Sequence, residues 1–114
     1  MTELKNNIYC GERDDNSVIN YVIVTVNGKL LPIDPDGISF QHEDRFDYGE
    51  NGEIYASKQL SLAILAHEYG PKNAIKYCKP FLEMFVSNFP DSWTLTSNEL
   101  KNYLKEMEKS IEVK

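Results

Sequence analysis

The sequence lacks the features that mark membrane proteins, secreted proteins and proteins with redox-active thiols. No apolar run among its 114 residues approaches the about 20 that span a bilayer, and residues 1–6 lack the apolar core of a signal peptide. The two cysteines, Cys10 and Cys78, lie far apart and outside any spacing typical of a metal site. We therefore expect a cytoplasmic protein in which both cysteines are small buried hydrophobic residues, with a disulfide or a reactive thiol as the alternative.

Positive charge is also scarce. The chain has 12 Lys and Arg against 18 Asp and Glu, which gives a formal net charge of -6 and a sequence pI near 4.8. Binding to nucleic acid without sequence preference depends on Lys and Arg that neutralise phosphates. We therefore expect no direct nucleic-acid binding. The acidity favours solubility, a basic protein partner, or imitation of nucleic-acid charge at a partner's groove.

Motifs for catalysis and metal binding are missing. His42 stands beside Glu43 and Asp44, but the sequence contains no HExxH or HxH spacing that would complete a metal or acid–base site. His67 falls within an apolar segment, where a structural histidine is more common than a catalytic one, although it could contact the acidic residues before that segment. Residues 34–37 predict a turn rather than a calcium loop, because the distant glutamate ligand is absent. We predict no enzyme activity, no cofactor and no metal site.

The composition is that of a folded domain. Hydrophobic residues make up 41% of the chain and aromatic residues 11%. A domain of this length buries roughly two thirds of the surface of its unfolded chain, which suffices for one core. We predict a single α+β domain over residues 1–114, with flexible ends at 1–6 and 110–114. Its fold class is a small antiparallel sheet, with an N-terminal β-hairpin and short strands, packed on about three helices of which one is buried and central.

The first third of the chain predicts strands. Residues 8–10 form a short strand candidate that Gly11 closes, and residues 18–26 are dense in β-branched side chains. Asn27-Gly28 is the favoured pair for a type I′ turn, so residues 18–26 and 29–31 are expected to form a hairpin. A further short strand is predicted at 38–40.

The clearest helix signal spans residues 57–70. Ser57 is a good N-cap, Gly70 can adopt the left-handed conformation that ends a helix, and the residues between them are apolar on almost every face. A helix of this kind must be covered on several sides. We predict that it is the central helix.

Two more helices are expected after Gly70. Pro71 suits the first turn of the second helix, and Pro80 is expected to kink or split it. Pro90 follows this segment, and Trp93 is expected between two helices, as a packing residue or as an exposed interface residue. The stripe assigned to the core comprises Ala74, Ile75, Cys78, Phe81, Leu82, Phe85, Val86 and Phe89.

The last helix begins with a capping box at residues 96–99 and carries a narrow apolar seam. We expect this seam to dock on the same chain, since helices of single domains usually bury their apolar stripe within their own domain. A homodimer formed through the seam is the second possibility. The seam comprises Leu100, Tyr103, Leu104, Met107 and Ile111.

Residues 41–56 interleave acidic and aromatic side chains and form the preferred partner- or ligand-binding surface. The alternative is a solvated connection whose aromatic residues pack over the central helix. Gln59, in the first turn of that helix, could tie the preceding loop in place or face a ligand. The candidate binding residues are Glu43, Asp44, Phe46, Asp47, Tyr48, Glu50, Glu53, Tyr55 and Gln59.

Short motifs along the whole chain resemble those of a small uncharacterised family found in bacteria, phages and other mobile elements. They are Tyr-x-Gly at 9–11, Val-x-Val-x-Gly-x-x-Leu at 24–31, Phe-x-aromatic-Gly at 46–49, Gln-Leu-x-Leu-Ala-Ile-Leu-Ala at 59–66 and Trp-x-Leu-Thr at 93–96. The resemblance implies no assigned activity. In members of that family, the segment before the glutamine of the fourth motif resembles Gly-Tyr-Gly-Gly-Ser-Gly-Pro. The corresponding residues 49–56 of this chain are more acidic.

These observations lead to two functional hypotheses. The first is a non-enzymatic acidic binding module, an accessory protein of a phage or mobile element that contacts a host protein and inhibits a host defence system. The second is a small-ligand protein that binds or sequesters a nucleotide signal through residues 46–59 and the N-terminus of the central helix. Arg45 and Lys58 are the only cations near that loop in the sequence, which is a handicap for the second hypothesis.

Overall fold

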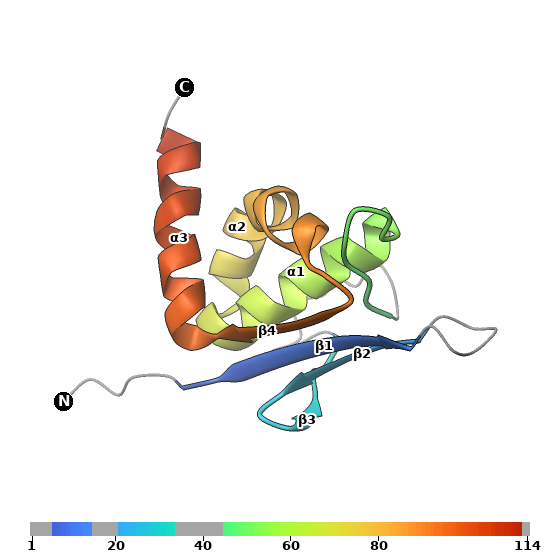
Figure 1. Cartoon of the computed structure of the whole chain (residues 1–114). Coiled ribbons are helices and arrows are strands. Elements are labelled where there is room, and N and C mark those ends of the chain that lie inside the picture. The colour runs from blue at the N-terminus through green and yellow to red at the C-terminus, as the bar shows by residue number, and fades with distance from the viewer. Residues whose placement is uncertain (1–5, 15–20, 34–44, 113–114) are drawn as a thin grey trace.

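The computed structural model describes residues 6–14, 21–33 and 45–112. These residues form a four-stranded antiparallel sheet with three α-helices on one side of it, which confirms the predicted α+β class (Figure 1). No helix among them is long and apolar enough to cross a membrane. The elements are β1 (Ile8–Asp14), β2 (Tyr21–Val26), β3 (Lys29–Leu30), α1 (Ile54–Tyr69), α2 (Pro71–Met84), the 3-10 helix η2 (Val86–Asn88), β4 (Ser92–Thr96) and α3 (Ser97–Glu112).

Several predictions from the sequence lie outside the described residues. They are the strand at 38–40, the turn at 34–37, the positions of His42, Glu43 and Asp44, and most of the two ends predicted to be flexible. Within those ends, Asn6 precedes β1, and residues 110–112 belong to α3.

The sheet has the strand order β3-β2-β1-β4, so β1 is a central strand. The prediction that Gly11 closes this strand was wrong, because β1 continues to Asp14. Gly11 pairs with Trp93 on β4, and the Trp93 indole occupies the space into which a side chain at residue 11 would project. The glycine is therefore a packing requirement within the strand rather than its end.

The strand β4 was missed by the sequence analysis. Trp93 does not lie between two helices but in this strand, where it is 7% exposed. Its ring packs against Phe89, with ring centroids 4.4 Å apart, and edge-on against Tyr48 at 5.7 Å. Trp93 is thus a core residue, as the packing interpretation predicted.

The hairpin between β2 and β3 is confirmed for the described residues. Asn27 and Gly28 have φ values of 54° and 83°, and both positions of a type I′ turn require positive φ. The turn leads into the two residues of β3 and then to Leu31, which is 4% exposed.

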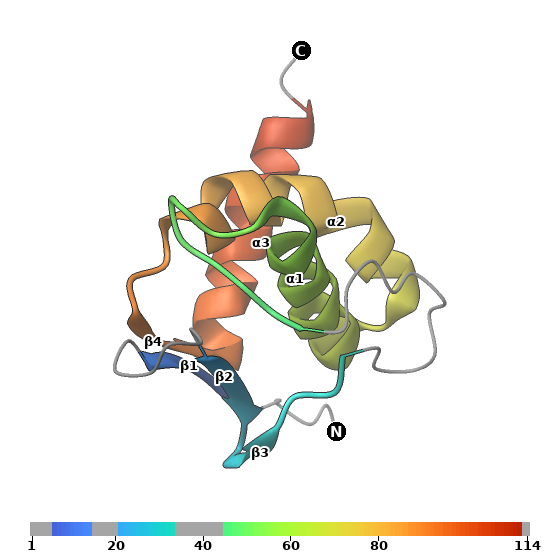
Figure 2. The same cartoon turned by 90° about the vertical axis from the view of Figure 1, so that its right-hand side faces the viewer.

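The central helix α1 is buried as predicted, and it lies between the sheet and α2 (Figures 1 and 2). Leu60, Ile64 and Leu65 are fully buried. The helix ends at Gly70, as predicted, with φ of 92°. It begins at Ile54, however, and not at Ser57.

The cap of α1 is Glu53 rather than Ser57. A carboxylate oxygen of Glu53, Oε2, accepts a hydrogen bond from the amide of Ala56 at 2.6 Å. This cap extends the helix by one turn towards its N-terminus, so Ile54 and Tyr55 are helical rather than part of a loop. Ser57 is buried inside the helix, where its hydroxyl has no hydrogen-bond partner among the residues that the structure describes.

The second helix, α2, runs through Pro80 without a break, so Pro80 does not split it, and the alternative of a kink stays a prediction. Ala74, Cys78 and Phe81 form its buried stripe. Ile75 was assigned to the core but is 50% exposed, because it lies about 100° around the helix axis from Ala74.

The capping box of α3 is confirmed by reciprocal hydrogen bonds. The amide of Glu99 donates to Thr96 Oγ1 at 3.2 Å, and the amide of Thr96 donates to Glu99 Oε1 at 3.0 Å. Leu100 and Met107 are fully buried, and Tyr103 and Leu104 are half-buried against the core. The described part of the seam therefore docks on its own chain, which was the first of the two expectations. The homodimer stays a prediction. The side chain of Ile111 is not among the side chains that the structure describes.

The two cysteines have different environments. Both are free thiols; Cys78 is buried, and burial raises its pKa. Cys10 is partly exposed on the open face of the sheet, so the prediction that both are buried was wrong for Cys10. In an alternating strand Cys10 points away from the helices, on the opposite face from buried Tyr9.

This difference gives a first prediction. We expect an alkylating reagent to modify Cys10 in the folded protein, and Cys78 at least about tenfold more slowly, because its thiol must be exposed by local opening. Intact-mass spectrometry over time measures both rates. A Cys10→Ser variant is the control and should be labelled only at the slow rate of Cys78 until urea is added. Equal rates at the two thiols would contradict the buried position of Cys78.

Candidate functional site

The loop at residues 45–53 connects to α1, and its inner part is buried. Phe46 and Tyr48 are 7% and 1% exposed. They pack in the hydrophobic core, as the alternative interpretation of this segment proposed. Gln59 is fully buried, and its Nε2 donates to the carbonyl oxygen of Ile33 at 2.7 Å. This bond agrees with the prediction that Gln59 ties backbone in place.

Asp47 anchors the loop. Its Oδ1 accepts hydrogen bonds from Arg13 Nη2 at 2.7 Å and from the amide of Tyr48 at 2.8 Å, and its Oδ2 accepts from the amide of Glu53 at 2.8 Å. Arg45 Nη1 lies 4.0 Å from Oδ2. One carboxylate therefore joins β1, the loop and the first residue before α1.

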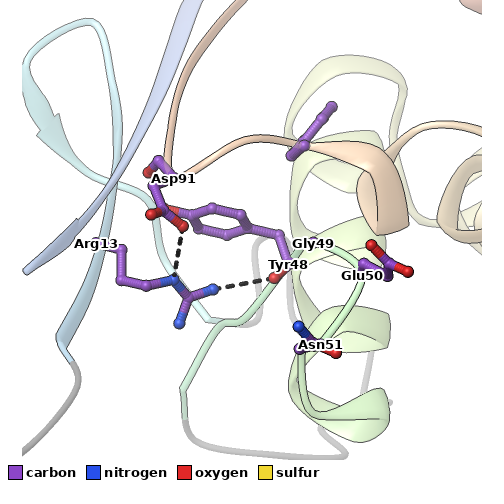
Figure 3. Close-up of a pocket in the computed structure, with 7 residues that line it drawn as sticks. Arg13, Tyr48, Gly49, Glu50, Asn51 and Asp91 are labelled. Atoms are coloured by element: carbon purple, nitrogen blue, oxygen red, sulfur yellow. Dashed lines mark hydrogen bonds and ion pairs between the residues drawn. The ribbon is translucent and has the colours of Figure 1, made fainter. Parts of the chain in front are cut away.

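Arg13 extends this connection to β4. Its Nη2 also donates to the carbonyl oxygen of Tyr48 at 3.0 Å, and its Nε lies 3.4 Å from Asp91 Oδ1 (Figure 3). The guanidinium carbon lies 4.9 Å from the centre of the Tyr48 ring. Burial raises the pKa of Tyr48 to about 12, so its hydroxyl stays protonated and donates to the carbonyl oxygen of Asp91 at 2.6 Å.

A pocket of about 320 Å³ opens beside this cluster. Among the described residues, Arg13 is the only cation that lines it, and both Asp47 and Asp91 already neutralise this guanidinium. The N-terminus of α1 is likewise capped by Glu53. The pocket therefore offers little attraction to a phosphate. Its lining residues are Arg13, Tyr48, Gly49, Glu50, Asn51, Phe89 and Asp91.

The outer part of the loop forms a tight turn. The amide of Gly49 donates to the carbonyl oxygen of Val86 at 3.0 Å, and the amide of Gly52 donates to that of Gly49 at 3.1 Å. Gly49 has φ of 91°, a conformation that favours glycine. These bonds fix the turn before any partner is bound.

Residues 49–55 form a ridge, which we call the Glu50 ridge. Glu50 and Asn51 are exposed at its crest, and Ile54 and Tyr55 are each 58% exposed in the first turn of α1. The pocket with Arg13 lies on one side of the turn, and a second hollow of about 300 Å³ lies on the other. Exposed Glu83, on α2, lines this second hollow together with Glu50.

The structure thus divides the predicted binding residues. Glu50 and Tyr55 are exposed, and Glu53 is partly exposed but its carboxylate caps α1. Glu43 and Asp44 lie outside the described residues. Phe46, Asp47, Tyr48 and Gln59 are buried and position the loop, and Tyr48 also lines the pocket beside Arg13.

Sequence reasoning missed Arg13, Glu83 and Asp91 as neighbours of the loop. Arg13 shares the inward face of β1 with buried Tyr9 and Gly11, and it was missed because the strand was expected to end at Gly11. Glu83 and Asp91 lie in other segments and carry no local signal of their proximity to residues 49–53.

A second polar cluster lies at the other end of α1. Glu68 is 2% exposed, and its Oε1 accepts hydrogen bonds from the Tyr9 hydroxyl at 2.9 Å, Asn7 Nδ2 at 3.0 Å and Ser97 Oγ at 3.1 Å. His67 Nδ1 lies 2.8 Å from the Tyr9 hydroxyl, so His67 contacts β1 rather than the acidic loop. Burial and the charge of Glu68 raise the pKa of Tyr9. The cluster joins β1, α1 and α3, which is a structural role.

Among the described residues, no group of three or more His, Cys, Asp or Glu side chains could hold a metal ion.

The anchoring role of Asp47 gives a second prediction. We expect Asp47→Asn to lower the free energy of unfolding by about 3 kcal/mol, because the change breaks charged hydrogen bonds that are largely shielded from water. Urea denaturation measures the loss. Glu50→Gln removes the same charge from the exposed crest and should change stability by about 0.5 kcal/mol or less. Equal effects of the two variants would show that Asp47 is not an anchor.

The same contacts predict a dependence on pH. Burial alone would raise the pKa of Asp47, but the bonds from the Glu53 amide, Arg13 and the Tyr48 amide outweigh it, and the pKa lies below its ordinary value. The folded state therefore favours the ionised carboxylate. Its contribution is complete above the ordinary pKa of about 3.9 and is lost as the pH falls through the folded pKa.

We accordingly expect the unfolding free energy to fall below about pH 4, and to fall less steeply in Asp47→Asn. Urea denaturation between pH 7 and pH 3 tests this expectation. Parallel curves for the two proteins would mean that other carboxylates cause the loss.

A model of a family of unknown function, DUF6166, matches residues 9–106. Neither the curated proteins nor the solved structures contain a match to the chain.

Proposed function

Because the chain belongs to the DUF6166 family, whose function is unknown, we propose from its geometry that it is a non-enzymatic, acidic protein-binding module. The module binds a basic surface of another protein through the Glu50 ridge. The expected compartment is the cytoplasm, where the partner is a host protein.

One observation carries this proposal: the Glu50 ridge presents exposed acidic and apolar side chains on a turn that is fixed from beneath. Ile54 lines the same hollow as Glu50, and the exposed Tyr55 follows it in the first turn of α1. Tyrosine side chains supply much of the binding energy in protein interfaces. The hydrogen bonds of Asp47 and Gly49 hold the turn, so little conformational entropy is lost on binding.

Charge supports the choice of a basic partner. Glu50 and Glu83 are exposed around one hollow. The whole chain has a net charge of -6. A complementary charge on the partner would accelerate association and help to exclude other proteins.

The proposal extends to the biological setting only through the family resemblance of the sequence motifs. In this form the protein is an accessory of a phage or mobile element that inhibits a host defence system by binding one of its components. A small acidic protein that blocks a basic surface suits such a role.

The alternative hypothesis of a nucleotide-binding protein has less support. An anionic ligand needs free positive charge, and the arginine in the pocket beside the loop is paired with two carboxylates. The N-terminus of α1 is occupied by the chain's own Glu53. A calorimetric titration with nucleotides would revive this hypothesis if it gave saturable binding that Arg13→Ala abolished.

Affinity purification from a bacterial lysate tests the principal proposal. The wild type is compared with a double variant, Glu50→Lys and Tyr55→Ala, and with a matched control, Glu12→Lys and Leu30→Ala. Both variants reverse one exposed acid and truncate one exposed apolar side chain, but the control lies on the sheet.

We expect a basic protein that the wild type and the control retain and that the ridge variant captures at least about tenfold less. Purified components should reproduce the difference by surface plasmon resonance. Capture of no partner, or equal loss in both variants, would count against the Glu50 ridge.

A further inference from the structure

The strand β4 forms an edge of the sheet, on the side away from β3 (Figure 2). Tyr9 pairs with Leu95 and Gly11 with Trp93, and the amide of Ser97 donates to the carbonyl oxygen of Asn7. In an antiparallel pair the hydrogen-bonded residues alternate, so Leu95 and Trp93 bond to β1. The backbone amides and carbonyls of Ser92 and Thr94 therefore point to this edge, which is open in the described part of the chain.

This edge lacks the usual protection against pairing. Natural edge strands are commonly guarded by lysine, proline or a bulge, yet the five residues from Ser92 to Thr96 contain no charge and no proline. The amide of Thr96 is already occupied by Glu99, which limits the open stretch to the first part of the strand.

An apolar hollow of about 360 Å³ lies directly beside the edge, and we call it the β4 groove. Phe85 and Tyr103 line it and stack on each other, with ring centroids 3.9 Å apart. Phe89 and Trp93 add two more rings. Thr94 belongs both to the open edge and to the groove, so the two features form one surface.

Acidic side chains flank the β4 groove, although two of them have a cationic neighbour: Asp91 Oδ1 lies 3.4 Å from Arg13 Nε, and Glu106 Oε1 lies 3.8 Å from Lys109 Nζ. Asp91 is exposed just before β4. On α3, the exposed Glu99 and Glu106 lie four residues before and three residues after Tyr103, and these spacings place all three on one face. The charge of Glu99, together with burial, raises the pKa of Tyr103, which agrees with this placement.

We propose that the β4 edge and groove bind an extended peptide segment of another protein as a fifth strand, with apolar side chains in the groove and Lys or Arg at its ends. Only an extended backbone offers donors and acceptors at the two-residue spacing of Ser92 and Thr94. The aromatic groove accepts alternate side chains, and the acidic rim selects the basic ends.

A second copy of this chain is a poorer occupant. Antiparallel pairing of two β4 strands would bring Asp91 of each copy close to the acidic start of the other copy's α3. Each copy also carries a net charge of -6, so the two would repel each other. The β4 groove is separate from the Glu50 ridge, and the proposal does not depend on that site.

The test begins with selection from a display library of random ten-residue peptides on the wild-type protein. We expect the selected peptides to alternate apolar residues and to carry Lys or Arg at their ends. Dissociation constants of the synthesised peptides are then measured by fluorescence anisotropy against three variants.

Thr94→Pro removes one donor at the open edge, and an edge strand tolerates proline there because this amide does not bond to β1. We expect at least about a tenfold loss of affinity. Glu106→Lys on the rim is expected to cost about fivefold. Glu83→Lys makes the same charge change beside the Glu50 ridge and should leave the affinity unchanged.

Methylation of single peptide amides provides a test that needs no variant. Strand pairing predicts that binding is lost at alternate positions only, because every second amide faces away from β4. This series and Glu106→Lys remain decisive if circular dichroism shows that Thr94→Pro does not fold.

Three results would overturn the proposal: no peptide is selected, the selected peptides bind the groove variants as tightly as the wild type, or methylation has the same effect at every amide. A dimer in which the Thr94 amide is protected from hydrogen exchange without peptide would assign the edge to a second copy instead. Loss of binding in Glu83→Lys alone would place the peptide on the Glu50 ridge.

Discussion

Replacing Gly11 with valine is expected to lower the free energy of unfolding by about 3 kcal/mol. A side chain at this position would project into the Trp93 indole on the neighbouring strand. The indole cannot move aside easily, because Phe89 and Tyr48 pack against it. The strain therefore falls on the centre of the sheet.

Urea denaturation measures this effect, and Glu12→Val is the matched control. Glu12 is the next residue of β1, but it is exposed on the open face of the sheet, so valine there should change stability by about 0.5 kcal/mol or less. A second check combines Gly11→Val with Trp93→Ala. The double variant should lose less than the sum of the single losses, because removal of the ring removes the clash. Additive losses would contradict the proposed steric cause.

Replacing Glu68 with alanine is expected to cost about 4 kcal/mol, because Oε1 of its carboxylate accepts hydrogen bonds from three other residues at a nearly water-free site. The loss leaves Tyr9 and Ser97 with buried hydroxyls that have lost an acceptor. Glu68→Gln keeps one acceptor oxygen and should lose less.

Thermal and urea denaturation of these variants should be compared with Glu83→Ala, which removes an exposed glutamate from α2 and is expected to be nearly neutral. A loss below about 1 kcal/mol in Glu68→Ala would show that the cluster does not hold the three elements together.

Local signals explain which parts of the fold could be predicted from the sequence. Asn27-Gly28 specifies its turn through backbone conformations that few other pairs adopt, and Thr96 and Glu99 cap α3 through each other. The apolar body of α1 required burial whatever surrounded it. Each of these signals lies within a few residues of the feature that it predicts.

The missed features depend on contacts between distant residues. Gly11 was interpreted as the end of a strand because a sequence does not reveal that Trp93 lies over it. The strand β4 was missed for the same reason, since its partner β1 lies at the opposite end of the chain. Ser57 is the better cap by residue type, but Glu53 is held in position by the Asp47 carboxylate and takes its place.

The residue types of the candidate site could be predicted from the sequence, but the directions in which their side chains point could not. An irregular loop has no repeat that separates inward from outward side chains, so the buried Phe46 and Tyr48 looked the same as the exposed Tyr55. The role of Asp47 required its pairing with Arg13, 34 residues away.

The hydrogen bonds between Asn7 and Ser97 join residues 90 positions apart, and this distance governs the order in which the protein can fold. During synthesis β1 can pair with β2 early, but its other edge stays open until β4, which follows much later in the sequence, has left the ribosome. Closure of such a long loop is entropically slow. The nascent chain therefore carries an unpaired central strand until β4 emerges, and this is the period in which it is most exposed to aggregation or to capture by a chaperone.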